Sequence, residues 1–129
     1  MSESKDEKAK DDKKQIGLTK KGQEDLAKVM ESGWFAEEQD AYRLAIAVAL
    51  AADVAASQAE LSGVGTKYNF GGGVDIDGKV RALIGIFAPD QVNVPGRYAE
   101  RLAHAGLAIL ASKLGDDDAL LADALSEAD

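Results

Sequence analysis

The stretch KKQIGLTKKGQEDL, residues 13–26, changes from strand spacing to helix spacing within a few positions. In its first part Ile16 and Leu18 alternate with small or polar residues, which is the two-residue period of a β-strand. This pattern predicts a short strand over residues 15–19. A lone strand cannot satisfy its own backbone groups, and no second strand is evident nearby, so we expect it to pair with the same strand of a second copy. The expected assembly is therefore a homodimer.

Two helices are expected after this strand. Thr19 can cap the first, which has apolar residues at helical spacing until Ser32 and Gly33 end it. A longer second helix is predicted over residues 33–61, with one apolar face formed by Leu44, Ala45, Val48, Ala52 and Ala55. Since the rest of its circumference is also largely apolar, we expect this helix to be buried on all sides at the centre of the dimer.

Three consecutive glycines, at positions 71–73, stand out in the connecting stretch over residues 62–78. The stretch lacks the Gly-Lys-Ser/Thr ending of a phosphate-binding loop, so a flexible loop is the expected structure. Asp75 and Asp77 match the start of a calcium loop, but the glycine and glutamate that complete such a loop are missing. Asp75 is therefore predicted to cap the helix that follows.

The second half of the chain predicts further helices. A helix over residues 77–87 should stop before Pro89, with an apolar stripe made of Val80, Leu83, Ile84 and Phe87. Pro95 opens another helix, expected to end at Gly115, with one face shared by Tyr98, Leu102, Ala105 and Ile109. Residues 115–129 are expected to form an acidic helix or tail.

The predicted fold class is mainly α, with a short N-terminal strand followed by about five helices. A length of 129 residues and 46% hydrophobic content suit one domain, which we place at residues 15–114 with a helical hairpin over 74–114. The charged tail over residues 1–14 is expected to be disordered, because it has almost no apolar residues to bury.

The composition of the chain limits its possible cellular location and the kinds of active or metal site it can form. The chain has no cysteine, which excludes disulfides, thiolate metal sites and thiol nucleophiles. The N-terminus has no apolar leader, and the longest apolar run, residues 44–52, is too short to span a bilayer. We therefore expect a cytoplasmic protein that does not contact membranes.

Charge differs sharply between segments of the chain. The net charge is -8, and residues 115–129 alone hold six acids and no base. A chain this acidic is repelled on average by phosphate backbones, so nucleic-acid binding would have to use local basic patches. Such a patch surrounds the predicted strand, where Lys13, Lys14, Lys20 and Lys21 lie.

Catalytic residues are scarce in this chain. His104 is the only histidine, and it lies between alanines on an apolar helix, where a structural role is favoured over catalysis. Glu37 and Glu38 are adjacent on a helix, so their carboxylates do not converge on one point. We expect no enzymatic activity, no metal site and no cofactor.

The order of strand, helix, turn and longer helix in residues 15–58 resembles the ribbon-helix-helix family. QIGLT matches the ribbon of that family, KKGQEDLAKVMES its first helix and AEEQDAYRLAIAVALAA its second. In the family two chains intertwine, and their paired ribbons enter the major groove of DNA. The resemblance implies base contacts by the outward residues of the ribbon, Gln15, Gly17 and Thr19, and phosphate contacts by the flanking Lys13, Lys14, Lys20 and Lys21.

The chain departs from this family at two places that bear on DNA binding. Its second helix begins with GWFAEEQD, and the three acids in that opening would repel the phosphate that the family holds there. Gly17 has no side chain with which to contact a base. The departures affect DNA recognition more than the fold.

The segments IGLTKKGQEDLAKVMESGWFAEEQDAYRLAIAVAL, DGKVRALIGIF and VPGRYAERLAHAGLAIL are together similar to small accessory proteins of bacterial DNA phosphorothioation and phage-defence clusters. This similarity implies a non-enzymatic component that associates with DNA or with neighbouring DNA-processing proteins. Its candidate contacts in the second half are Lys79, Arg81, Arg97 and Arg101, which can equally be surface charges that keep helices hydrated.

Two functions follow from these patterns. The first is a dimeric, DNA-associated accessory or regulatory protein, based on the basic residues around the strand. The alternative is an acidic interaction module that binds a basic protein partner without contacting DNA. In that case the acidic start of the second helix and the acidic C-terminal helix would bind the partner.

Overall fold

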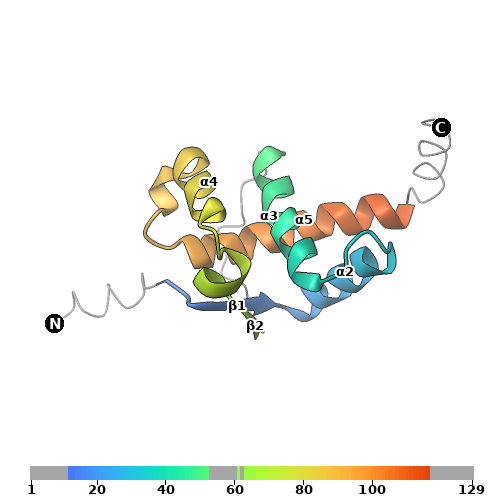
Figure 1. The fold of residues 1–129 in the computed structure, drawn as a ribbon. Coiled ribbons are helices and arrows are strands. Elements are labelled where there is room, and N and C mark those ends of the chain that lie inside the picture. The colour runs from blue at the N-terminus through green and yellow to red at the C-terminus, as the bar shows by residue number, and fades with distance from the viewer. Residues whose placement is uncertain (1–11, 53–60, 62, 117–129) are drawn as a thin grey trace.

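The computed structural model describes residues 12–52, 61 and 63–116, and the described part is mainly helical, as predicted. The elements in chain order are β1 (Gln15–Leu18), α2 (Lys20–Glu31), α3 (Glu38–Ala51), β2 (Gly65–Asn69), a π-helical turn η1 (Phe70–Val74), α4 (Lys79–Phe87), a 3-10 turn η2 (Pro89–Gln91) and α5 (Pro95–Asp116). The long helix α5 runs the length of the molecule, with β1 and α2 along one side of it (Figure 1). None of the described helices combines the length and hydropathy needed to cross a membrane.

Strand β1 pairs within its own chain, so the expectation that no second strand lies nearby is wrong. Its antiparallel partner is β2, in which Tyr68 lies opposite Ile16 and Gly65 lies opposite Leu18. The register shifts between Ile16 and Gly17, which leaves Lys67 as an extra residue on β2 in the manner of a β-bulge. The stretch that contains β2 was expected to be a flexible loop, and that prediction is also wrong.

Helix α2 agrees with the sequence prediction at both ends. The Oγ1 atom of Thr19 accepts a hydrogen bond of 3.0 Å from the N–H of Gly22, which is the expected N-cap. The helix ends at Glu31, Ser32 is its C-cap, and Gly33 follows with a φ of 79°. Glycine adopts this left-handed conformation without steric cost, so the chain can turn sharply here.

Helix α3 begins at Glu38, later than predicted, and buries a different face. Trp34 and Phe35 lie in the turn before the helix. The buried residues are Ala41, Tyr42, Ala45, Ile46 and Ala49, whereas Leu44 is 40% exposed and Ala52 is exposed. The prediction of burial on all sides is therefore wrong, and the part predicted over residues 53–60, with Ala55, lies outside the described residues.

Helices α3 and α5 cross at very short range. A Cβ atom built on Gly106 would lie 1.8 Å from the carbonyl oxygen of Ala45, so only glycine fits at this crossing. The buried residues of α5 are Gly96, Ala99, Glu100, Leu102, Ala103, Gly106, Leu107 and Ala111. Of the predicted stripe only Leu102 is fully buried, and Tyr98, Ala105 and Ile109 are half-buried.

Asp75 caps α4 as predicted. Its buried carboxylate accepts hydrogen bonds from the N–H groups of Val80 (2.7 Å) and Arg81 (3.1 Å) and from Nε of Arg81 (2.6 Å). Helix α4 buries Val80 and Ile84 of its predicted stripe, but Phe87 is 62% exposed, contrary to expectation.

The two ends of the chain are described only in part. Asp12 and Lys13 belong to the segment expected to be a disordered tail, yet both make hydrogen bonds to α5. Helix α5 continues to Asp116, one residue past its predicted end. The predictions for residues 1–11 and 117–129 lie outside the described residues.

Candidate functional site

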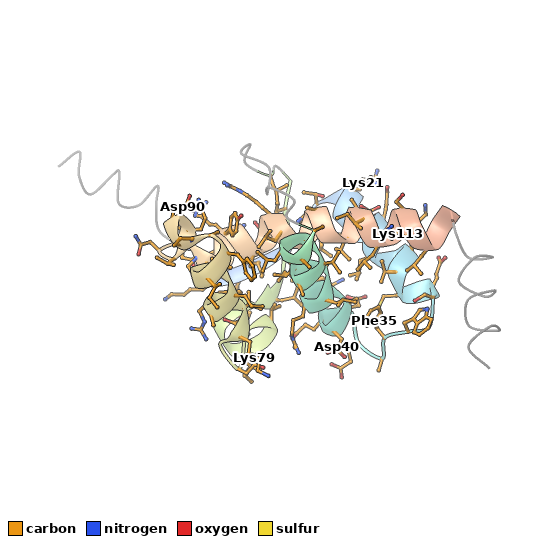
Figure 2. The ribbon with its side chains drawn as sticks, turned by 90° about the horizontal axis from the view of Figure 1, so that it is seen from above. Lys21, Phe35, Asp40, Lys79, Asp90 and Lys113 are labelled. Atoms are coloured by element: carbon orange, nitrogen blue, oxygen red, sulfur yellow. The ribbon has the colours of Figure 1, made fainter. Side chains whose placement is uncertain are left out.

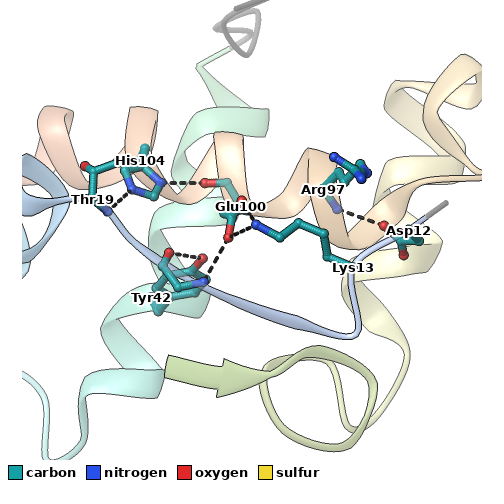
Figure 3. Close-up of polar contacts among 8 residues, drawn as sticks. Asp12, Lys13, Thr19, Tyr42, Arg97, Glu100 and His104 are labelled. Atoms are coloured by element: carbon teal, nitrogen blue, oxygen red, sulfur yellow. Dashed lines mark hydrogen bonds and ion pairs between the residues drawn. The ribbon is translucent and has the colours of Figure 1, made fainter. Parts of the chain in front are cut away.

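A buried carboxylate on α5 holds the start of the chain in place. Glu100 is 4% exposed, and its Oε2 atom accepts a hydrogen bond of 2.9 Å from the N–H of Gly17 (Figure 3). The ammonium group of Lys13 donates to both carboxylate oxygens, at 2.8 and 2.9 Å. Lys13, a predicted phosphate contact, thus neutralises a buried acid.

His104 lies one helical turn further along α5 and binds the next part of the same segment. Its Nε2 atom accepts a hydrogen bond of 3.0 Å from the N–H of Thr19, and its Nδ1 atom lies 2.7 Å from the carbonyl oxygen of Glu100. Because Nε2 accepts a hydrogen bond through its lone pair, the ring proton is on Nδ1, which donates a hydrogen bond to that carbonyl oxygen. This arrangement agrees with a structural role for His104.

Tyr42 of α3 completes the contacts around β1. Its hydroxyl donates a hydrogen bond of 3.0 Å to the carbonyl oxygen of Gly17, and burial raises the pKa of Tyr42 well above its ordinary value. The ring also packs edge-on against Tyr68, with centroids 4.9 Å apart. Since side chains of α3 and α5 bind both polar groups of Gly17, β1 has no room there for a strand from a second copy.

The three residues expected to contact bases are buried or make hydrogen bonds within the fold. Gly17 is buried, and Thr19 uses its hydroxyl to cap α2. Gln15 is exposed and donates a hydrogen bond of 3.3 Å to Asn69. The three residues therefore do not form an exposed row along β1.

The predicted phosphate contacts have several different environments. Lys21 pairs with Asp25 at 2.7 Å, Lys79 with Asp77 at 4.0 Å, and Arg81 with Asp75 at 2.6 Å. Arg97 and Arg101 are half-buried on α5 and also interact with other groups. Lys14 and Lys20 are exposed, and neither makes an ion pair with another described residue.

Three of these cations surround one hollow, which we call the basic hollow. It has a volume of about 450 Å³, and its lining includes Lys13, Lys14 and Arg81 together with Gly71 and Gly72. Lys13 and Arg81 also bind the buried acids Glu100 and Asp75. The lining also includes Asp12, whose carboxylate accepts hydrogen bonds from the N–H groups of Gly96 and Arg97, so its negative charge offsets part of the positive charge of Lys14.

An apolar groove lies between α3, α5 and the turn that joins α2 to α3. We call it the Trp34 groove; it has a volume of about 420 Å³ and is lined by Trp34, Phe35, Leu44, Leu110, Lys113 and Leu114. Trp34 is 57% exposed, a large unburied area for an aromatic side chain. Figure 2 shows Phe35 and Lys113 toward the same end of the molecule, opposite to the end where Asp90 lies.

Acidic side chains border the Trp34 groove. Asp40 precedes Leu44 by four residues on α3, so the two lie on the same side of that helix. Glu37 follows Phe35 by two residues and is exposed. Glu38 already forms an ion pair with Lys67, whose ammonium group lies 2.7 Å from its carboxylate. The hydrogen bond from this ammonium group holds the pKa of Glu38 below its usual value.

The groove was not predicted from the sequence. Trp34 and Phe35 were assigned to the start of a helix, and Leu44 to a buried stripe. A usable clue was the pair of adjacent aromatic residues directly after the helix stop at Gly33, in a chain with only 5% aromatics. Aromatic residues exposed in a turn are typical of protein-binding surfaces.

The described residues contain no group of three or more His, Cys, Asp or Glu side chains that could hold a metal ion. Comparisons with protein-family models, with curated proteins and with solved structures find no match to this chain.

Proposed function

We propose that this protein is a non-catalytic interaction module that binds apolar side chains of a partner protein in the Trp34 groove. The observation that carries the proposal is the exposed apolar lining, in which Trp34 is 57% and Leu44 is 40% exposed. Partly buried apolar residues, among them Phe35, Leu110 and Leu114, form the base of the groove and pack against the core. A rigid base with exposed apolar walls is the usual form of a groove that accepts a partner helix.

Fluorescence of the single tryptophan tests this function directly, because Trp34 lines the groove. The probe is an uncharged amphipathic peptide of leucine and glutamine with leucines at helical spacing. Binding in the groove should remove water from Trp34 and shift its emission to shorter wavelength. Leu44→Ser should weaken binding several-fold, while Ile86→Ser, at an exposed apolar residue of α4, should leave it unchanged. An unshifted emission at saturating peptide would contradict the proposal.

A second proposal retains association with DNA through the basic hollow, as an accessory protein of a DNA-modification or phage-defence system. It is supported by Lys14, which is exposed beside Lys13 and Arg81. A titration of labelled duplex DNA at several salt concentrations tests it, since phosphate contacts weaken steeply with salt. Lys14→Glu should lower the affinity, whereas Lys28→Glu, at an exposed position of α2, should change it less. Equal affinities for these two variants would remove the basic hollow from the proposal.

The homodimer also remains a proposal, and it needs a surface other than β1. A candidate surface is formed by Ile86, Phe87 and Val92, which are 70%, 62% and 50% exposed at the end of α4 and after it. Light scattering over a range of concentrations would detect such a dimer, and Phe87→Ser should then shift it toward monomer.

A further inference from the structure

Building on the proposed function, we propose that the Trp34 groove accepts one face of an amphipathic α-helix whose opposite, polar face is basic. The partner would place apolar side chains against Trp34, Leu44 and Leu110, and its lysines or arginines would lie beside the acidic border. The inference specifies that the partner is helical and basic, two properties that an apolar groove alone does not determine.

The walls of the groove favour a helical partner. Leu110 and Leu114 lie four residues apart on α5, so they are neighbours on one face of that helix. Side chains at i and i+4 of a partner helix have the same spacing and can fit beside them. A partner that adds a β-strand would need a strand edge, and no described strand borders this groove.

The charges around the groove favour a basic partner. Glu37 and Asp40 are exposed and lie close in the chain to the Phe35 and Leu44 walls. The guanidinium of Arg43 lies 4.0 Å from Asp40 and offsets part of its charge, and Lys113 is the one charged residue of the lining itself. The net charge of the chain, -8, also favours a cationic partner.

The same charges argue against two other occupants. The chain's own C-terminal segment is apolar in part, through Leu120, Leu121 and Leu125, but it carries the charge sign of the groove's border. A second copy of the chain has a net charge of -8 and would meet the same repulsion. A basic helix has no such penalty.

Three synthetic peptides test the inference against the full chain. All three have leucine at the same positions, with helical spacing. The remaining positions are all lysine in the first peptide, all glutamine in the second and all glutamate in the third. Trp34 emission and calorimetry at low salt should show the lysine peptide binding about fivefold or more tightly than the glutamine peptide, and the glutamate peptide binding most weakly. The difference should shrink at high salt, because exposed charges are screened.

Variants of the border separate a groove effect from general attraction to an acidic protein. Glu37→Gln with Asp40→Asn should reduce the preference for lysine over glutamine, whereas Glu24→Gln, at an exposed position of α2, should not. Circular dichroism of each variant would establish that the fold is kept.

The outcomes distinguish this inference from the function on which it rests. Binding of all three peptides with equal affinity would overturn the basic partner but retain the groove. Binding of none would overturn both. Tighter binding of the glutamate peptide, or a concentration-dependent shift of Trp34 without peptide, would indicate an acidic segment or a second copy as the occupant and overturn the inference.

Discussion

The N–H of Gly17 donates a hydrogen bond of 2.9 Å to the buried carboxylate of Glu100, which joins the first strand to the last described helix. The carbonyl of the same glycine accepts from Tyr42 on α3. Gly17 is thus fixed from both sides by side chains of the helical core. A segment that resembles a DNA-contacting ribbon is, in this fold, an internal structural element.

Replacing Gly17 by alanine should destabilise the protein strongly. An added Cβ would lie 1.8 Å from the carbonyl oxygen of Gly65, so the two strands would have to separate. We expect a loss of about 3 kcal/mol or more in the free energy of unfolding, measured by urea denaturation. Gly71→Ala is the matched control, because a Cβ there meets nothing within 4 Å and the change should stay within about 1 kcal/mol. Equal effects would show that β1 and β2 are not packed as described.

Removing Lys13 should cost stability through the charge it leaves behind. Lys13→Met leaves the carboxylate of Glu100, which is 5% exposed at the side chain, without its cation. We expect a loss of about 2 kcal/mol in the free energy of unfolding. Lys79→Met removes a more exposed pair at 4.0 Å and should change stability by less than about 0.5 kcal/mol. A Lys13→Met protein as stable as the parent would mean that the N-terminal segment does not lie against α5.

The ring of His104 should be neutral and protonated at Nδ1. The N–H of Thr19 points to Nε2, and only Nδ1 is left to donate to the carbonyl of Glu100. Ring nitrogen chemical shifts from ¹⁵N NMR at neutral pH identify the tautomer. Protonation at Nε2 would contradict the contact between His104 and the start of α2.

Alkaline pH should weaken the fold partly through Tyr42. Because burial raises its folded-state pKa, the folded protein keeps the phenol proton at pH values where the unfolded chain releases it. The stabilisation is complete below the unfolded pKa of about 10 and is lost as pH rises above it. Tyr42→Phe should lose about 1 kcal/mol at neutral pH, with the missing hydrogen bond, but decline less at high pH. A gap between the two proteins that stays constant from pH 8 to 11 would contradict this assignment.

Local signals in the sequence were sufficient for much of the fold. Thr19 and Asp75 cap helices as their side-chain chemistry predicts, and Gly33 follows α2 with a positive φ. These features depend on residues close in sequence. The mainly helical architecture after one short strand follows from the same kind of local pattern.

Contacts between distant residues were not predictable in this way. The partner of β1 lies in a stretch where Gly65 and the glycines at 71–73 obscure strand spacing, and the pairing depends on how closely Gly17 can approach Gly65. The buried face of α3 is set by the close contact between Ala45 and Gly106, which rotates Leu44 out of the core. That rotation makes Leu44 a wall of the Trp34 groove, so the adjacent aromatic residues Trp34 and Phe35 were the only local clue to the groove.

The most direct test of the account is to map the binding of the leucine-lysine peptide by ¹H–¹⁵N NMR. The account predicts shifted signals for the Trp34 indole and for the amides of Leu44, Leu110 and Leu114, with those of Gly17 and Thr19 unchanged. Shifts concentrated at Gly17 and Thr19, with an unaffected Trp34 indole, would contradict it and return recognition to the β1 segment.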